Sequence, residues 1–198
     1  MSERITNILL AGVGGQGILL ASEVLAEAFM LAGFDVKKSE IHGMSQRGGS
    51  VVSHVRYGKK VFSPVVPEGA GDLLFGFELL ETCRALPLLK PGAKVIANDF
   101  RILPPSVLLG SAAYPEALAE KMAARFPDFM LVDGQGLAHQ AGDLRAANTV
   151  LLGAVSNKLD ISEENWMQAL EKMVPEKVLE LNKQAFSMGR ALRCKKQV

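Results

Sequence analysis

The fold of this chain is decided by the segment Ile5–Ala32, which begins ITNILLAGVGGQG and continues ILLASEVLAEAFMLA. The short apolar run that ends before Gly12 is typical of a buried strand. After Gly17, apolar residues recur at spacings of three and four, as they do on one face of a helix. Gly12, Gly14 and Gly17 fit the pattern G-x-G-x-x-G between that strand and that helix. The sequence therefore predicts a strand, a glycine turn and a helix as the first unit of an α/β fold.

The glycine turn admits three interpretations. A dinucleotide site would need an acidic side chain at the end of the second strand, to hold the ribose hydroxyls. We expect that strand at Phe34–Ser39, with Asp35 near its start, Lys37 and Lys38 near its end, and Glu40 just beyond. The two lysines would instead favour a 2′-phosphate. The same turn can also simply close a βα unit, or it can face a partner subunit or the partner's ligand.

Length and composition indicate an ordinary globular protein. The 198 residues predict a single domain, 1–198, in which residues 148–198 form a helical part packed on the rest. Apolar residues make up 48% and charged residues 22%, and the net charge of +1 provides no strong field for nucleic acid. With no signal peptide and no apolar span long enough for a membrane, the expected location is the cytoplasm.

The sequence offers no metal centre and no catalytic constellation of its own. Its two cysteines, Cys83 and Cys194, lie far apart, whereas an iron–sulfur cluster normally needs four thiolates. The three histidines, at positions 42, 54 and 139, show no metal-ligand spacing. No arrangement of nucleophile and base can be recognised. We therefore expect no metal, no bound cofactor and no catalytic residue in this chain alone.

Strand and helix patterns alternate along the rest of the chain. Ser50–Tyr57 and Lys60–Ser63 predict a β-hairpin around Gly58-Lys59. Further strands are expected at 72–77, 94–98 and 129–133, with helices at 78–86 and 115–126, a loop at Pro104-Pro105, and helices only from Asn148 onward. This order predicts a mainly parallel, doubly wound (Rossmann-like) α/β sheet with a β-hairpin insertion and a helical C-terminal region.

Four loops follow strands and should gather at one edge of the sheet, because parallel strands end at the same edge. Ligands of such sheets bind at that edge, outside the carboxyl ends of the strands. These loops are Gly12–Gly17, Glu40–Gly49, Asn98-Asp99 and Asp133–Gly136. The positions of these loops therefore predict a ligand or partner site at the carboxyl edge of the sheet.

Two of these loops, read together, resemble a known family. GVGGQGI at residues 12–18, followed by GMSQRGG at residues 43–49, is similar to the gamma subunit or domain of 2-oxoacid:ferredoxin oxidoreductases. The version with Ser-Gln-Arg-Gly-Gly is most like the beta subunit of the indolepyruvate (arylpyruvate) ferredoxin oxidoreductases. The resemblance continues through 76–78, 86–92, Asn148 with 151–154, and 182–189, so that it covers nearly the whole chain.

The resemblance implies a function shared with a partner. Such complexes oxidatively decarboxylate a 2-oxoacid, form acyl-CoA with CoA as co-substrate, and reduce ferredoxin. In the family a larger catalytic subunit carries thiamine diphosphate and [4Fe–4S] clusters, so this chain would be the subunit without cofactors in a hetero-oligomer. Asp133-Gly134-Gln135-Gly136 fits that division, because it reverses the Gly-Asp-Gly of a thiamine site, and Asn148 follows it too soon.

The expected site residues belong to the two matching loops and would face a ligand or the partner. Arg47 is the strongest candidate, because a guanidinium can grip a carboxylate or phosphate in bidentate fashion. Ser45 and Gln46 offer neutral hydrogen bonds. Arg47 can equally make a structural ion pair or a subunit contact. The full set is Gly12, Gly14, Gly15, Gln16, Gly17, Ser45, Gln46, Arg47, Gly48 and Gly49.

Other conspicuous side chains have ordinary explanations. His42 is expected to be a loop histidine and not a catalytic base, His54 a core or sheet-face residue within a strand, and Trp166 a core residue. Two further functions stay open beside the family's own: a free-standing NADP-dependent Rossmann oxidoreductase, and a non-enzymatic module that binds CoA or a nucleotide. Titration with NADPH and CoA distinguishes these two.

Overall fold

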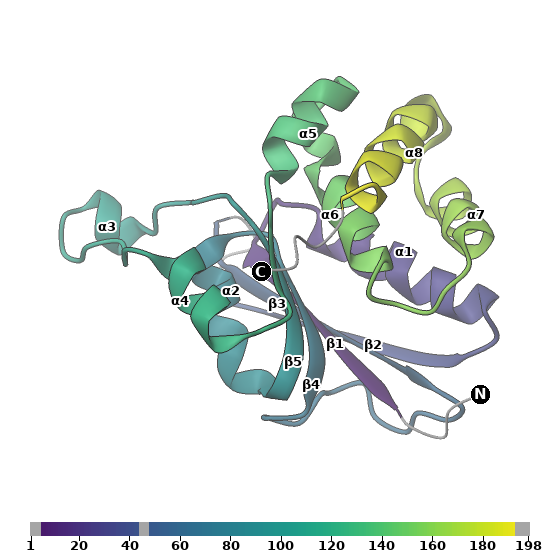
Figure 1. Cartoon of the computed structure of the whole chain (residues 1–198), viewed down its shortest axis with the longest axis horizontal. Coiled ribbons are helices and arrows are strands. Elements are labelled where there is room, and N and C mark those ends of the chain that lie inside the picture. The colour runs from purple at the N-terminus through teal and green to yellow at the C-terminus, as the bar shows by residue number, and fades with distance from the viewer. Residues whose placement is uncertain (1–4, 44–47, 193–198) are drawn as a thin grey trace.

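A six-stranded sheet forms the centre of the fold in the computed structural model, which describes residues 5–43 and 48–192 (Figure 1). The strands lie in the order β2-β3-β1-β4-β5-β6, and β1, β4, β5 and β6 run parallel. β3 is antiparallel to both neighbours. The strands are β1 (Thr6–Val13), β2 (Asp35–His42), β3 (Ser50–Gly58), β4 (Gly71–Gly76), β5 (Leu89–Asn98) and β6 (Phe129–Val132). The predicted mainly parallel α/β fold is confirmed.

Helices cover both faces of this sheet (Figure 1). One face carries α1 (Ile18–Leu31), α5 (Gly134–Ala141), α6 (Ala147–Ser156), α7 (Glu163–Met173) and α8 (Glu176–Arg190), with the 3-10 turn Leu144–Ala146 between α5 and α6. The other face carries α2 (Leu79–Ala85) and α4 (Leu118–Arg125). The 3-10 turn Leu86–Leu88 precedes β5, and α3 (Pro105–Leu108) lies on an arm beyond it.

The central strand β1 explains why helices are needed on both faces. Ile8 and Leu10 point into the core shared with α1, α6, α7 and α8, whereas Leu9 and Ala11 point into the core on the other face. All four side chains are fully buried. Such a strand reads as one continuous apolar run, which is what the sequence before Gly12 shows.

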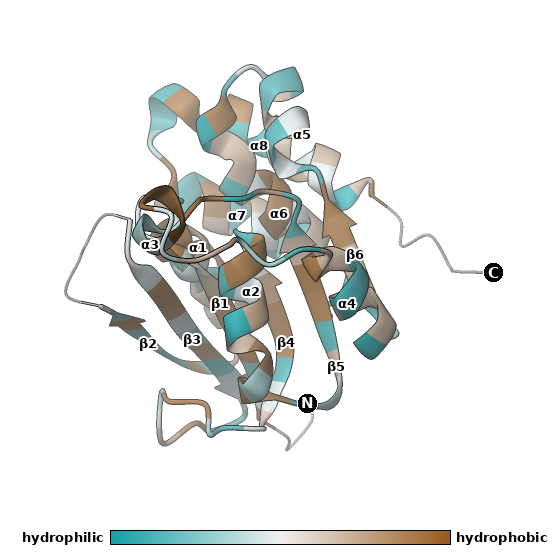
Figure 2. Cartoon of the chain, turned by 90° about the vertical axis from the view of Figure 1, so that its left-hand side faces the viewer, coloured by the Kyte–Doolittle hydropathy of each residue, from teal (hydrophilic) through white to brown (hydrophobic). Residues whose placement is uncertain are grey.

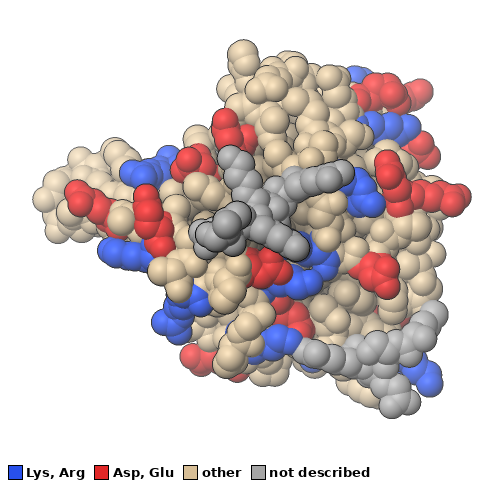
Figure 3. Space-filling view, viewed as in Figure 1, with Lys and Arg blue, Asp and Glu red and all other residues tan. Residues whose placement is uncertain are grey.

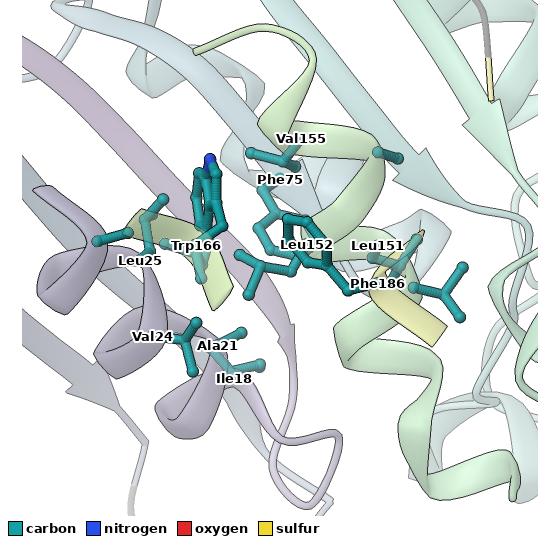
Figure 4. Packing of buried hydrophobic residues seen from close by; sticks show 14 of the residues in the cluster. Ile18, Ala21, Val24, Leu25, Phe75, Leu151, Leu152, Val155, Trp166 and Phe186 are labelled. Carbon is teal, nitrogen blue, oxygen red and sulfur yellow. The ribbon is translucent and has the colours of Figure 1, made fainter. Parts of the chain in front are cut away.

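The C-terminal helices pack into the same core as the strands. Trp166 of α7 and Phe186 of α8 are fully buried, with ring centroids 5.6 Å apart (Figure 4). Helices α6 and α8 approach closely at Gly153 and Gly189. A Cβ at Gly189 would lie 1.8 Å from the carbonyl oxygen of Val150, so only glycine fits there. The prediction that Trp166 is a core residue is confirmed.

The predicted partner of the antiparallel strand was wrong. Lys60–Ser63 is not a strand, and β3 pairs instead with β2, in a register from Asp35 opposite Gly58 to His42 opposite Val51. The N–H of Val61 donates to the carboxylate of Asp35 at 2.9 Å instead of joining a ladder. β2 is therefore longer than predicted, and it is separated from β1 by β3.

Three local boundaries also differ from prediction. The expected loop Asp133–Gly136 is largely the first turn of α5, because the Asp133 carboxylate accepts from the N–H of Gly136 at 2.8 Å and caps the helix. The loop at Pro104-Pro105 contains the short helix α3. The helix expected from Pro115 begins only at Leu118, because Ala117 adopts a left-handed conformation with φ of 53°.

The surface mixes charges of both signs. Acidic and basic side chains are interspersed on the face seen in Figure 3. Among the described helices, none has the length and apolar character required to cross a bilayer.

Candidate functional site at the carboxyl edge of the sheet

The strand ends bring the predicted loops together at one edge of the sheet. A cleft of about 640 Å³ opens there beside the glycine turn. A second hollow of about 460 Å³ lies on the other side of the turn, against the end of β2 and the start of β3. The cleft is lined by Gly15, Gln16, Gly17, Leu20, Phe77, Asn98, Phe100, Gln135, Leu144, Arg145, Ala147, Asn148 and Leu151. The glycine turn therefore forms a ridge between two hollows.

Gln16 folds back and fixes the glycine turn to the neighbouring strand. Its Oε1 accepts from the N–H of Val13 at 2.7 Å, and its Nε2 donates to the carbonyl oxygen of Phe77 at 3.0 Å. A Cβ at Gly12 would lie 2.7 Å from Gln16 Oε1 and 2.8 Å from Phe77 Cβ. Gly12 is thus required by this packing. Gly15, in contrast, is exposed, and a Cβ added to it would meet no heavy atom within 4 Å.

Among the described residues, no side chain closes the start of α1. Gly17, at the N-cap, has a left-handed φ of 79° and makes no side-chain cap, and no acidic residue lies in the first turn. Asn148 of α6 closes in from the C-terminal part, with Nδ2 donating to the Gly17 carbonyl oxygen at 3.4 Å. A helix start of this kind presents N–H groups and a partial positive charge, which suit an anion.

The second predicted loop returns to the first. The N–H of Gly14 donates to the carbonyl oxygen of Gly49 at 2.8 Å, and the N–H of Gly48 donates to that of Gly14 at 3.3 Å. Gly48 also has a left-handed φ of 75°. Thus the structure brings together seven of the ten predicted site residues. The other three, Ser45, Gln46 and Arg47, lie outside the described residues.

Neutral amides connect the strand ends to one another. Asn98, at the end of β5, is buried and donates from Nδ2 to the Phe77 carbonyl oxygen at 3.2 Å. Its Oδ1 accepts from the N–H of Gly134 at 3.0 Å, at the start of α5. The Phe77 carbonyl oxygen therefore accepts from both Gln16 and Asn98. This network holds the ends of β1, β4 and β5 and the start of α5 in one rigid arrangement.

Charge is sparse in the cleft. Arg145 is the charged side chain among the described residues that line it, and its Nη2 lies 2.6 Å from Asp143 Oδ2. The hydrogen bond from Arg145 lowers the pKa of Asp143. Within residues 5–43 and 48–192, no group of three or more His, Cys, Asp or Glu side chains is placed to hold a metal ion. The cleft can orient a ligand by hydrogen bonds, but its described lining contains no acid–base pair.

Of the two histidines with a predicted position, His54 lies where it was expected, whereas His42 is the last residue of strand β2 and not a loop residue. His54 is buried in β3, its Nδ1 accepts from the N–H of Val66 at 2.9 Å, and burial lowers its pKa. The expectation that His54 is a core residue is confirmed. His42 is exposed at the end of β2, lines the second hollow beside Glu40, and has Nδ1 3.1 Å from the carbonyl oxygen of Gly43.

The strand order does not fit a dinucleotide site of the Rossmann type. In a Rossmann site the acidic residue comes from the strand beside β1, but here β3 occupies that place. The end of β2 is displaced by about 5 Å, one strand spacing. The two lysines are also engaged, since Lys37 pairs with Asp35 at 2.8 Å and Lys38 pairs with Glu23 at 3.2 Å. The hydrogen bond from Lys37 is the main reason that the pKa of Asp35 falls to about 2.

Sequence reasoning underestimated two residues of the cleft. Asn148 entered only through the family resemblance, and Arg145 was not singled out at all. Asn148 lies 131 residues from Gly17, so no local pattern could have placed them together. The only sequence signal for Asn148 was its position just before an apolar helical run. Many buried helices begin with such a residue, so this signal does not indicate a site.

Comparison with known proteins assigns this arrangement to a class. The family model for pyruvate ferredoxin/flavodoxin oxidoreductase matches residues 7–192. The chain is 39% identical over 191 residues to the indolepyruvate oxidoreductase subunit IorB of Thermococcus kodakarensis, covering 92% of this chain and 93% of that protein. The corresponding subunit of Archaeoglobus fulgidus is 37% identical over 187 residues, with 92% of each chain covered.

A solved structure agrees with this assignment. The gamma subunit of a keto/oxoacid ferredoxin oxidoreductase from Geobacter sulfurreducens PCA superposes with a TM-score of 0.67 at 26% identity, covering 93% of this chain and 95% of that one. The chain therefore belongs to the pyruvate ferredoxin/flavodoxin oxidoreductase family, as a gamma-type subunit. More particularly, it is a subunit of a multi-subunit oxidoreductase of the indolepyruvate/2-oxoacid:ferredoxin type. The family resemblance seen in the sequence is confirmed.

Proposed function

We propose that this chain is the subunit without bound cofactors in a complex that oxidatively decarboxylates an arylpyruvate, first of all indolepyruvate, to the acyl-CoA and reduces ferredoxin. The observation that carries this proposal is the 39% identity, over nearly the full length of both chains, to a protein named as an indolepyruvate oxidoreductase subunit. The cleft supports it, because its described lining positions neutral amides and backbone N–H groups but no catalytic pair.

The cofactors are proposed to reside on a larger catalytic subunit, which would supply the decarboxylation and electron-transfer chemistry through thiamine diphosphate and [4Fe–4S] clusters. Two cysteines in the whole chain fall short of the four thiolates that one cluster normally takes. The Asp133 carboxylate, in the segment that superficially resembles a thiamine motif, already caps α5 through the N–H of Gly136. These residues do not fit either group.

The role left to this chain is to complete and enclose the shared site. The uncapped start of α1 offers N–H groups to an anion, and the exposed Gly15 lets a ligand or a partner backbone approach the ridge. We propose that both matching loops, residues 12–17 and 45–49, face that boundary. The anion would be a phosphate of CoA or thiamine diphosphate, or a carboxylate of the larger subunit.

Arg47 remains the proposed charged contact of this boundary. It is joined directly to Gly48, whose N–H bonds to the carbonyl oxygen of Gly14 on the glycine ridge. We propose that an arginine one residue from that contact reaches an anion held at the start of α1. Its planar guanidinium suits a bidentate bond to phosphate or carboxylate.

The two other functions make different demands. A free-standing NADP-dependent enzyme needs the end of β2 beside the glycine turn, and β3 intervenes there. A CoA- or nucleotide-binding module without activity is compatible with a cleft of about 640 Å³. The family subunit is favoured over that module because the similarity extends along residues 7–192 and not only around the cleft. We place the complex in the cytoplasm, where ferredoxin would reach it through the larger subunit.

Co-purification tests this proposal. A tagged form of the chain is expressed in its native source, and the proteins that elute with it are identified. We expect one larger subunit, a coloured complex, and reduction of ferredoxin or a viologen dye that depends on both indolepyruvate and CoA. The chain alone should be colourless and inactive.

Three results would contradict the proposal. Absorbance of the isolated chain near 400 nm, about where a thiolate-bound [4Fe–4S] cluster absorbs, would place a cofactor in this chain. Binding of NADPH by the isolated chain with a dissociation constant of about 1 μM, or about −8 kcal/mol, would favour the free-standing oxidoreductase. Tight binding of CoA without any eluting partner would favour the binding module.

A further inference from the structure

Within the described part of the chain, the outer edge of β2 pairs with no other strand. β2 is the first strand in the sheet order and pairs only with β3 among the described strands. Figure 2 shows it as the outermost strand, and most of its side chains from Lys37 onward are exposed. Such an edge presents a row of N–H and C=O groups that can pair with another strand.

The two faces of β2 carry different side chains. Lys38 Nζ lies 3.2 Å from Glu23 Oε1 of α1, so Lys38 is on the face that α1 covers. Glu40 is on the same face, because it lines the hollow together with Leu19 of α1. Ser39, between them, is on the opposite face, since side chains alternate along a strand.

We propose that β2 pairs antiparallel with β2 of a second copy of this chain, with Ser39 on the two-fold axis. Side chains that face each other across an antiparallel pair lie on the same side of the sheet. For two copies of the same strand, one residue must therefore face its own copy across the two-fold axis. An axis between two consecutive residues would pair side chains from opposite sides of the sheet. With Ser39 on the axis, Lys38 of each copy lies opposite Glu40 of the other, and the two sheets become continuous.

The neighbouring registers are disfavoured by charge. An axis through Lys38 places the two lysines opposite each other, and an axis through Glu40 does the same with the two glutamates. Like charges directly opposite in a sheet are destabilising, whereas opposite charges contribute favourably. The charges of β2 thus favour the register centred on Ser39 over the two registers next to it.

The same charges explain why the occupant should be a second copy. Lysines on an edge strand normally discourage pairing, because a neutral or basic strand would leave them facing no counter-charge. A second copy of β2 places its Glu40 opposite Lys38, and by symmetry this ion pair forms twice in the dimer. The register also sets Ile41, which is 53% exposed, against the alkyl stem of Lys37. The interface is narrow and charged, so the dimer should be weak and should weaken further in salt.

This pairing needs only β2 and does not depend on the proposed function. Sedimentation equilibrium of the purified chain tests it, across concentrations from about 1 to 100 μM, the range of a weak complex. Glu40→Lys should raise the dimer dissociation constant by about tenfold, because two attractive pairs become repulsive. Lys38→Glu should do the same, and the double exchange Lys38→Glu with Glu40→Lys should restore dimerisation. Glu23→Gln is the control, since it removes the contact of Lys38 within the chain and leaves the charges of β2 unchanged.

Cross-linking tests the register itself. In a background with Cys83→Ser and Cys194→Ser, oxidised Ser39→Cys protein should form a covalent dimer, because the two substituted positions face each other. Lys37→Cys should not, because Lys37 lies opposite Ile41. Circular dichroism checks that each variant is folded. A chain that stays monomeric throughout, a double exchange that fails to restore dimers, or equal cross-linking of both variants would overturn the proposal.

Discussion

Three helices directly follow strands at the carboxyl edge of the sheet, and their first turns are completed in two different ways. α2 is capped by the carboxylate of Glu78 and α5 by that of Asp133. α1 begins at Gly17 with no side-chain cap and no acidic residue in its first turn. The capped starts are closed by a carboxylate of the chain itself, whereas no described side chain closes the start of α1, so its first N–H groups suit an anion.

Burial sharpens the contrast. Glu78 is 1% exposed, and besides capping α2 it accepts from the hydroxyl of Tyr114 at 2.6 Å and from the N–H of Ile102 at 3.2 Å. It thereby fastens both ends of the arm that carries α3. Burial and this hydrogen bond raise the pKa of Tyr114. The capped start serves the stability of the chain, and the open start is proposed to serve the complex.

The largest expected effect is at the capped start of α2. Glu78→Ala leaves three donors without their acceptor, so the free subunit should lose about 3 kcal/mol of unfolding free energy. Its melting temperature should fall by about 10 °C for a chain of this size. Tyr114→Phe removes one of the three bonds and should cost about a third as much. Equal melting curves for Glu78→Ala and the wild type would mean that the carboxylate is not a structural cap.

The next effect concerns the open side. Arg47→Lys keeps the charge but loses the planar fork, so activity of the reconstituted complex should fall at least about tenfold, or 1.4 kcal/mol. The melting temperature of the free subunit should barely change. Oxoacid-dependent dye reduction and thermal melts measure the two quantities. Full activity combined with a melting temperature several degrees lower would show that Arg47 makes a structural ion pair.

A smaller effect compares two side chains at the same edge. Asp133→Ala removes the cap of α5 and should lower the melting temperature by about 3 °C, with activity of the complex unchanged. Asn148→Ala removes the contact with the Gly17 carbonyl oxygen and should lower activity by more than its change in stability accounts for. If both variants behave alike in both assays, the two helix starts do not differ in role.

A still smaller effect concerns whether the chain unfolds as one domain. We propose that residues 1–198 act as one domain, because α6, α7 and α8 share their core with β1 and α1. Thermal unfolding should then show one transition, whether followed by the fluorescence of Trp166 or by far-UV circular dichroism. Two separate transitions would divide the C-terminal helices from the sheet.

Local patterns predicted the parts of the molecule that depend on local structure. The strand, glycine turn and helix of residues 5–32 follow from periodicity and glycine spacing, and the gathering of loops follows from the parallel order of strands. The partner of β3 could not be predicted, because two candidate strands flank Ser50–Gly58 in sequence and only the three-dimensional register decides between them. The contact of Asn148 with Gly17 depends in the same way on packing between distant segments.

The central claim, that the ridge at the start of α1 faces a ligand or partner, is tested most directly by a pair of glycines. Gly15 and Gly69 both have left-handed φ angles, 104° and 71°, and neither has a heavy atom within 4 Å of an added Cβ. Alanine is strained at both positions, and more at Gly15, because its φ lies outside the left-handed α region; thermal melts of the two free subunits measure each cost, which is about 1 kcal/mol at Gly69. The measurement is indolepyruvate- and CoA-dependent dye reduction by complexes carrying Gly15→Ala or Gly69→Ala. We predict at least a tenfold loss of activity, about 1.4 kcal/mol, for Gly15→Ala and full activity for Gly69→Ala. Equal activity of the two complexes would contradict the account.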